Sequence, residues 1–288
     1  MKIEDTLTNL RKKNSLTQDG TSMEIISVTN ENLDKEHICC AISSNIDCQV
    51  SAKKGWLAER FEDGLVFKKL NVRGKCFIEY IPAEKAWAPI KADGYMYINC
   101  LWVSGQFKGQ GYSSLLLDEC IKDSKAKEKK GLVILSSKEK KGLVILSSKK
   151  KTGFLSDPKY LKYKGFKTID TANPYFELMY LPFNETDEKP YFKAHIKQDN
   201  KIVKRNGFTL YYTNQCPFTA KYVPLLENIA KSKNIDFQVV HLVTVKQAQN
   251  APSPYSTFSL FYNGEFITHE ILSEKKFEKI LIANDIII

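Results

Sequence analysis

A glycine-rich loop lies between a strand pattern and a helix pattern in the middle of the chain. Residues 99–117 read NCLWVSGQFKGQGYSSLLL, with a strand reaching Val103 and an aliphatic helix starting at about Tyr112. Glycines let a backbone approach a ligand, and the N–H groups of such a loop and of the first helical turn attract anions. The loop is neither a Walker motif nor a G-x-G-x-x-G dinucleotide motif. The pattern predicts an α/β chain with an anion site at this strand end.

An eleven-residue sequence occurs twice without a difference. Residues 128–138 and 139–149 both read EKKGLVILSSK. Repeat folds need periods of about 20 to 50 residues and at least three copies, so two short copies indicate a duplicated strand within one domain. A sheet has one place for Leu-Val-Ile-Leu. We expect the second copy, 142–148, to occupy this place in the sheet. The first copy would then lengthen the connection between the preceding helix and this strand, away from the glycine loop.

The remaining patterns divide the chain into two folded units. Residues 1–22 form a polar N-terminal extension without the apolar run of a secretory signal. Residues 184–206 are charged and nearly free of aliphatic runs, which predicts a linker. We therefore expect a first domain at 23–183, which contains the duplication, and a second domain at 207–288.

Alternating and helical apolar patterns predict the elements of both units. In the first unit we expect a strand that runs into a turn over 23–33, helices at 36–43, 51–64, 111–130 and 156–165, and strands at 65–71, 73–82, 86–104, 166–170 and 175–183. In the second we expect a strand at 208–213, a helix at 220–234, a strand at 237–243, a hairpin at 258–271 and a helix at 273–284. Asn263-Gly264 is a strong signal for the turn of that hairpin.

Composition excludes several classes of protein. A hydrophobic content of 43% supports packed cores, and no run approaches the 18 or so apolar residues of a membrane span. The seven cysteines are irregularly spaced, without a C-x-x-C pair, and there are only four histidines. We therefore expect no metal site, no membrane partner, and a reducing, cytoplasmic location in which most cysteines are small buried hydrophobic residues.

The net charge of +10 raises the question of a nucleic-acid partner. Fifteen lysines lie between residues 122 and 167, against four acidic residues, so the excess is confined to one segment around the duplication. Such a segment is a solvated face or helps to hold an anionic cofactor, and neither requires a polynucleotide. We expect no nucleic-acid partner, and the sequence carries no signal for an oligomeric state.

The glycine loop and its flanks resemble the GNAT family of N-acetyltransferases. Gln106-x-x-Gly109-x-Gly111 between a strand and an aliphatic helix is similar to that family's acetyl-CoA pyrophosphate signature, and YLKYKGF at 160–166 is similar to its closing helix and Gly-Phe pair. The resemblance spans about 23–183. It implies a mixed, mostly antiparallel sheet with helices on both faces, and acetyl-CoA as co-substrate. The implied cofactor-binding residues are Leu101, Val103, Gln106, Phe107, Lys108, Gly109, Gln110, Gly111 and Tyr112.

The resemblance also implies direct attack of a small-molecule or peptide amine on the thioester. Pantetheine would lie in a gap between the loop-bearing strand and the duplicated strand. Family members often carry a glutamate on the strand before the loop, but YMYINCLWV has none, which leaves Glu79, Glu84 or a water chain as the base. The tyrosine that assists the leaving thiolate corresponds here to Leu161. It is flanked by Tyr160 and Tyr163, of which we assign Tyr160 as catalytic.

Cysteines suggest further chemistry at two places. Glu36-His37 and Cys39-Cys40 are compatible with a nucleophile, with metal ligands, or with a helix that lines the substrate site. In the second unit, a thiol at a helix N-terminus begins the loop Cys216-Pro217-Phe218-Thr219, and the helix dipole favours its thiolate. This unit resembles the thioredoxin and glutaredoxin fold as a smaller βαβ-ββα domain, with Pro252 or Pro254 as its cis-proline. Thr219 replaces the resolving cysteine, which leaves one-thiol chemistry at Cys216.

Together, the two units resemble the YoaP-type acetyltransferases of bacteria. The first hypothesis is therefore an enzyme that moves acetyl from acetyl-CoA to an amine, with the second unit gating or recruiting the substrate. The alternative is a thiol-redox or thiol-conjugate binding protein that works through Cys216, in which the first unit only binds CoA.

Overall fold

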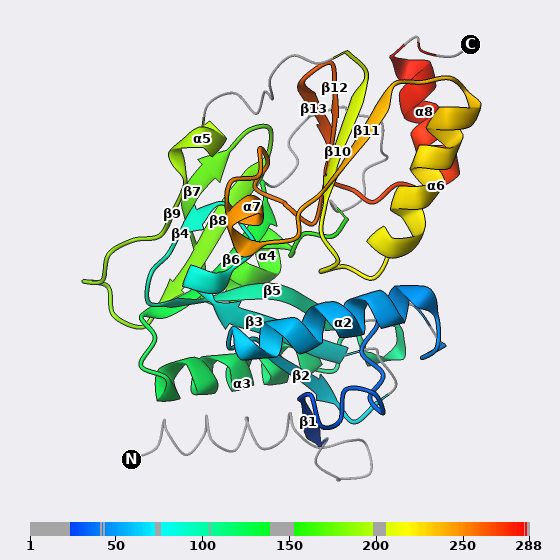
Figure 1. Cartoon of the computed structure of the whole chain (residues 1–288). Coiled ribbons are helices and arrows are strands. Elements are labelled where there is room, and N and C mark those ends of the chain that lie inside the picture. Colours follow the sequence, from blue (N-terminus) through cyan, green and yellow to red (C-terminus); the bar gives the residue numbers. More distant parts are fainter. Residues whose placement is uncertain are drawn as a thin grey trace, which may run out of the picture.

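The structure of the chain, a computed structural model, is built around two main sheets (Figure 1). The larger sheet has seven strands, the smaller has four, and a two-stranded ribbon lies beside them. The structure describes residues 24–40, 42, 44–72, 76–103, 105–138, 153–197, 206–284 and 286.

The seven-stranded sheet carries the glycine loop. Its strands are β1 (Ile25–Val28), β2 (Val66–Leu70), β3 (Cys76–Pro82), β5 (Tyr95–Val103), β6 (Gly131–Ser137), β7 (Lys167–Ala172) and β8 (Phe176–Pro182), in the order β1-β2-β3-β5-β6-β8-β7. Neighbours are antiparallel except β5 and β6, which are parallel and joined through helix α3 (Tyr112–Ala126). The predicted mixed, mostly antiparallel sheet is confirmed.

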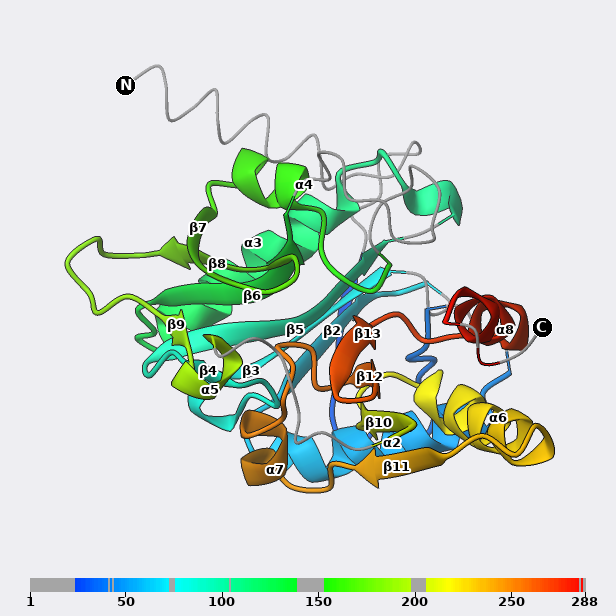
Figure 2. The same ribbon diagram turned by 90° about the horizontal axis from the view of Figure 1, so that it is seen from above.

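Alternating side chains of this sheet form two apolar layers, as the pleat of a strand requires. Tyr80, Met96 and Ile98 belong to the layer under α3 and α4 (Pro158–Tyr163). Phe77 and Tyr97 belong to the opposite layer, under α2 (Cys48–Glu62). Residues of the four-stranded sheet and of the short helix at 245–249 pack against the rest of this second face (Figure 2). Helices thus cover both faces of the sheet, as predicted.

The four-stranded sheet belongs to the C-terminal unit. Its strands are β10 (Phe208–Tyr212), β11 (Phe237–His241), β12 (Phe258–Tyr262) and β13 (Glu265–Thr268), in the order β11-β10-β12-β13. Helix α6 (Thr219–Ser232) links the parallel pair β10–β11, and α8 (Glu274–Ala283) packs with α6 on one face. Asn263 and Gly264 form the hairpin turn with positive φ values, as predicted. The naming of this unit as thioredoxin-like stays a prediction.

The two units are joined by packing and by specific hydrogen bonds. Gln249, which ends the short helix α7 (Val245–Gln249), donates from Nε2 to the carbonyl oxygens of Glu84 and Ala86 at 3.0 and 3.1 Å. The Ser256 hydroxyl donates to the Trp87 carbonyl. Tyr175, from the turn between β7 and β8, hydrogen-bonds to Nδ1 of His269 at 2.7 Å. These contacts hold the C-terminal unit against the sheet that carries the glycine loop.

Two sequence expectations about connections need correction. The predicted linker at 184–206 contains β9 (Tyr191–Phe192), which pairs with β4 (Ile90–Lys91), and helix α5 (Ala194–Lys197). Among the described residues the cis peptide bond precedes Pro174, and the bonds before Pro252 and Pro254 are trans. Two short 3-10 turns complete the described elements, at Ala83–Lys85 and Gly105–Phe107.

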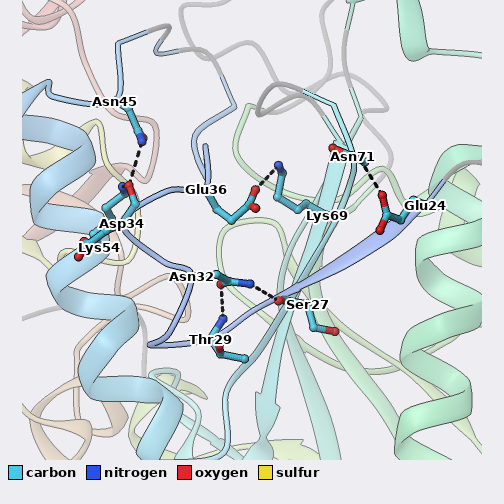
Figure 3. A network of polar contacts seen from close by, with 10 residues as sticks. All are labelled: Glu24, Ser27, Thr29, Asn32, Asp34, Glu36, Asn45, Lys54, Lys69 and Asn71. Carbon is cyan, nitrogen blue, oxygen red and sulfur yellow. Dashed lines mark hydrogen bonds and ion pairs between the residues drawn. The ribbon is translucent and has the colours of Figure 1, made fainter.

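The helix predicted at 36–43 does not form. The described part of this segment has no helical turn and is held by polar contacts instead (Figure 3). Glu36 pairs with Lys69 of β2 at 2.7 Å, and the Asp34 carbonyl accepts from Lys54 at 2.7 Å. These contacts with residues distant in sequence override the local preference for a helix. Ile38 and the two cysteines that follow it pack against the sheet.

The prediction that the second copy of the duplication fills the sheet is wrong. The first copy forms β6, whereas residues 142–148 lie outside the described residues. β6 starts a few residues after α3 ends, within the usual length of a helix-to-strand connection. A Cβ added at Gly131 would lie 2.3 Å from the carbonyl oxygen of Leu181, so this position requires glycine. The additional sequence therefore follows β6, between Lys138 and Gly153.

Removing one copy tests this placement. Deletion of 128–138 or of 139–149 gives the same protein, because the copies are identical. We expect a melting temperature no lower than that of the parent, since loop length changes stability by only about 0.6 kcal/mol per doubling. A calorimetric melting temperature several degrees lower would show that both copies contribute to the fold.

Candidate active site

The parallel strands β5 and β6 separate beyond the middle of the sheet. Their pairing runs from Tyr95 opposite Gly131 to Ile98 opposite Ile134 and stops there, although both strands continue. The second half of β5 keeps β3 as its partner on the other side. Among the described residues, its peptide groups facing β6 therefore have no ladder partner beyond Ile98, which leaves a slot into which an extended ligand can insert.

The glycine loop follows the separated end of β5. Gly105, Gly109 and Gly111 have φ values of 61°, 77° and 81°, and a Cβ added at any of them would meet nothing within 4 Å. Gly111 is the N-cap of α3 and supplies no side-chain cap. Within the described chain, no backbone hydrogen bond outside the regular elements uses the N–H groups of residues 109–113. The loop therefore offers an open row of donors at a helix N-terminus, as predicted for an anion site.

A cavity of about 480 Å³ lies at the separated strands and extends to the C-terminal unit. We call it the interface cavity. Side chains from the sheet line one part of it, among them those of Phe77, Glu79, Tyr97, Asn99, Cys100, Trp102 and Leu135. The remaining walls come from 38–40, from Lys53 and Trp87, and from 153–156, 215–218 and 254–257.

A buried ion pair lies in the wall of this cavity. Lys53 Nζ of α2 lies 2.6 Å from Glu79 Oε2 of β3, and the two side chains are 5% and 1% exposed. Asn99 Nδ2 donates to the other carboxylate oxygen, Glu79 Oε1, at 2.8 Å. The register between β3 and β5 shifts next to Glu79, so that Asn99 is the additional residue of a bulge. Bulges turn side chains toward functional sites, and here the bulge directs Asn99 at the carboxylate.

Two polar atoms of the lining have no hydrogen-bond partner among the described residues. They are Asn99 Oδ1 and Trp87 Nε1, both buried. Because the amide nitrogen of Asn99 donates to a carboxylate, its oxygen must face the other way. Buried polar groups in native proteins nearly always have partners. One buried acceptor and one buried donor among the lining residues thus have unused hydrogen-bonding capacity.

Of the two candidate bases from the sequence, the structure places Glu79 in the cavity and Glu84 outside its lining. Glu84 instead accepts a hydrogen bond from the Gly94 N–H at 2.6 Å. Cys39, Cys40 and Cys100 line the cavity together with Glu79. The substrate-lining interpretation of the Cys39-Cys40 pair is therefore the one that the geometry favours, although the segment is not a helix.

Tyr160 does not reach the interface cavity. It packs on the α3 side of the sheet, and its hydroxyl is buried without a hydrogen bond to the described residues. Burial raises the pKa of Tyr160, and the neighbouring hydroxyls of Ser113 and Ser114 lower it by less. The side chain is therefore a neutral phenol beside the first turn of α3. Tyr163, in contrast, is 82% exposed.

The expectation of a low pKa at Cys216 is wrong. Burial raises its pKa to about 12, and the hydrogen bond from the Phe218 backbone lowers it by much less. The sequence shows the helix N-terminus but not the apolar cavity against which this thiol lies. Burial likewise raises the pKa of Cys39 to about 12 and that of Cys100 well above its usual value. These three thiols are protonated at neutral pH.

The sequence missed Lys53, Trp87, Asn99 and Tyr255 as site residues. Each comes from a different segment, and only the folded arrangement brings them together. In the described ranges, no group of three or more His, Cys, Asp or Glu side chains is arranged to hold a metal ion. No helix in the same ranges is long and apolar enough to span a membrane.

Comparisons with known proteins give both sequence and structural matches. A family model described as YoaP-like matches residues 236–279. The "Uncharacterized N-acetyltransferase YoaP" of Bacillus subtilis (strain 168) is 42% identical over 257 residues, which cover 89% of this chain and 97% of that protein. The paia N-acetyltransferase from Thermoplasma acidophilum in complex with coenzyme A is 16% identical, with a TM-score of 0.38 over 57% of this chain and 100% of that chain. A GNAT family acetyltransferase from Brucella melitensis in complex with acetyl-CoA is 12% identical, with a TM-score of 0.36 over 60% of this chain and 96% of that chain.

Thiol labelling tests the burial of these cysteines. Cys48, at the start of α2, is the exposed thiol of the seven. We expect limiting iodoacetamide near neutral pH to modify Cys48 first and Cys216 much more slowly, because alkylation requires an accessible thiolate. Peptide mapping by mass spectrometry measures the order. Faster labelling of Cys216 than of Cys48 would contradict the buried, protonated state.

Proposed function

The chain belongs to the same family as the YoaP N-acetyltransferase of Bacillus subtilis, and we propose that it transfers acetyl from acetyl-CoA to an amine in the interface cavity. The observation that carries this proposal is the open glycine loop at the end of a strand that has separated from its parallel neighbour. These features support the proposal, in which phosphates bind at the loop, an extended chain occupies the slot, and the acetyl group lies near a buried carboxylate.

In this proposal the loop binds the pyrophosphate of acetyl-CoA. The N–H groups from Gly109 onward donate to phosphate oxygens, and the start of α3 adds its dipole. The neighbouring exposed side chains of Gln106, Lys108 and Gln110 border the same site, with the partly buried Phe107 and the buried Tyr112 beneath it. Backbone groups in the unpaired second half of β5, which includes Leu101 and Val103, then bind the pantetheine amides in the place where β6 would otherwise pair.

The reaction requires little chemistry from the protein beyond positioning and proton transfer. The amine nitrogen forms a bond to the thioester carbonyl carbon, and the carbon–sulfur bond breaks as CoA leaves with the bonding electrons. The nitrogen loses a proton and the thiolate gains one. We assign Glu79 as the proton acceptor, because it is the carboxylate that the described residues contribute to the lining of the cavity.

The leaving thiolate needs a proton donor in the cavity, where the thioester lies in this proposal. Tyr160, the donor suggested by the sequence, is a neutral phenol beside the first turn of α3 and outside the lining of the cavity, so the geometry does not support that role. Cys216 has a different role in the proposal. Its protonated thiol forms part of the cavity wall, and its raised pKa gives no support to the alternative of a thiol-redox protein.

The direct test of the function is a search for acetylated products. The full chain is incubated with isotopically labelled acetyl-CoA and a metabolite extract, and mass spectrometry identifies labelled amides that need active protein. The proposal expects at least one such product. If CoA binds but no amide appears from amine-rich extracts or peptide mixtures, then acetyl transfer is not the function.

Gly109→Asp tests the cofactor loop. The new carboxylate would occupy open space in front of the loop, where phosphates are expected, and repel them. Loss of one charged hydrogen bond alone costs about 1.5–3 kcal/mol, so we expect CoA affinity to fall by about tenfold to a hundredfold or more in calorimetry. Gly109→Asn is the matched control, because it has nearly the same size and backbone strain without the charge. Equal affinities of the two variants would contradict phosphate binding at this loop.

Glu79→Gln tests the base. A general base contributes about 10²–10⁴-fold to a rate, so we expect turnover to fall by that order while the KM for acetyl-CoA stays nearly constant. Glu84→Gln is the control, since Glu84 lies outside the lining of the cavity. Because Lys53 would lose its partner, the double variant Lys53→Met with Glu79→Gln provides a neutral replacement of the pair. Full activity in a folded Glu79→Gln variant would remove Glu79 from the mechanism.

A further inference from the structure

We propose that the acceptor is a small primary amine on an apolar, aromatic body, with no carboxylate and no second ammonium group. This inference rests on the proposed function and specifies its substrate class. Its basis is the charge balance, the lining and the size of the interface cavity, to which the C-terminal unit contributes an entire wall.

Charge balance in the cavity excludes acceptors with further charges. Among the described residues of the lining, the side chains with a formal charge at neutral pH are Glu79 and Lys53, and they neutralise each other at 2.6 Å. The reacting nitrogen attacks the thioester as a neutral amine, because its lone pair must be free. A carboxylate on the acceptor would need an unused cation, and a second group that stays an ammonium would need an unused anion. The described part of the lining offers neither. A buried charge without a partner is strongly unfavourable, so amino acids and polyamines fit this cavity poorly.

The lining is complementary to an aromatic body. Trp87, Tyr97 and Trp102 contribute rings from the first unit, and Phe218 and Tyr255 contribute rings from the second. The thiols between them belong to Cys39, Cys40, Cys100 and Cys216, which are small and polarisable. Ring edges and faces of this kind attract another aromatic ring beyond the gain from burial.

The size of the cavity and its few free polar atoms exclude a peptide chain. The volume of about 480 Å³ is near the lower end of the roughly 300–1,000 Å³ typical of small-molecule sites, and the acyl end of acetyl-CoA must share it. A peptide would also bring backbone donors and acceptors that need partners. The fully buried side-chain nitrogen and oxygen atoms of the lining without a partner are Asn99 Oδ1 and Trp87 Nε1 among the described residues. The unpaired peptide groups of β5 are assigned to pantetheine in this proposal, which leaves few polar partners for a peptide acceptor.

The same atoms define how the amine is oriented. Asn99 Oδ1 is a buried acceptor next to the Glu79 carboxylate, because the other end of the same amide donates to Glu79. An amine N–H can donate to this oxygen while its lone pair stays free for the thioester. The aromatic body then extends away from the ion pair, toward the wall formed by 215–218 and 254–257.

Exposed aromatic side chains mark an opening of the cavity. Trp102 of β5 is 37% exposed and Phe154 is 42% exposed, and both line the cavity. Phe154 has a φ of 66°, which is an outlier for a bulky residue. Such strain is concentrated at ligand sites. An apolar amine entering here would cover these two rings, which supports the same class of acceptor.

Matched probe pairs test the inference on the full chain saturated with CoA. Phenethylamine and phenylalanine differ by one carboxylate, and butylamine and putrescine differ by one ammonium. We expect calorimetry to show each monoamine binding at least about tenfold more tightly than its charged counterpart, with phenethylamine the tightest. Phenylalanine or putrescine binding as tightly as its partner would overturn the inference, and so would the absence of binding by phenethylamine.

A variant in the C-terminal wall tests the role of that unit. Phe218→Ala should weaken phenethylamine binding by roughly tenfold or more and leave CoA binding unchanged. Tyr163→Ala is the control, since Tyr163 is an exposed aromatic residue outside the lining. Unchanged phenethylamine affinity in a folded Phe218→Ala variant would overturn the assignment of this wall.

Turnover separates a failure of this inference from a failure of the proposed function. With acetyl-CoA, we expect mass spectrometry to detect N-acetylphenethylamine in amounts well above N-acetylphenylalanine or acetylputrescine. Preferential acetylation of putrescine or phenylalanine would overturn the substrate class while leaving acetyl transfer intact. Failure of the chain to bind CoA at all would instead contradict the proposed function.

Discussion

The separation of β5 from β6 is the constraint on which the rest of the site depends. Parallel neighbours gain a hydrogen bond at each step, yet these two stop pairing at Ile98 and Ile134 while both strands continue. The separation leaves the second half of β5 without a described ladder partner on the β6 side, whereas Ser136 of β6 bridges to Ser156, and the interface cavity lies beside them. The glycine loop begins where β5 ends, so one distortion of the sheet places the anion site, the slot and the cavity in line.

A second sheet and a buried ion pair complete this arrangement. Lys53 and Glu79 are almost fully buried, which is costly unless both charges are well paired. Packing of α2 on one side and hydrogen bonding from Asn99 on the other hold the pair in place. The C-terminal unit then forms one wall of the cavity and reduces its contact with bulk water, which strengthens the electrostatic interactions inside it. The same desolvation keeps the Cys216 thiol protonated.

The sequence predicted those features that depend on local patterns. The loop around Gly109, the start of α3 at Tyr112 and the hairpin turn at Asn263 all follow from residue types at fixed short spacing. The Lys53–Glu79 pair joins residues 26 positions apart, and its formation depends on packing that no short pattern encodes. Cys216 shows the same limit, because its helix position was visible whereas its apolar surroundings were not. Identical copies of a strand likewise contain no information about which one is used.

The central claim is that the glycine loop, the separated strands and the C-terminal wall form one acetyl-transfer site. Hydrogen exchange of the full chain, measured by mass spectrometry with and without acetyl-CoA, tests it most directly. The account predicts slower exchange in 105–113, in the second half of β5, and in the wall segments 215–218 and 254–257 (Figure 2). Protection confined to the lysine-rich surface at 122–130, with exchange of the loop and the wall unchanged, would contradict it.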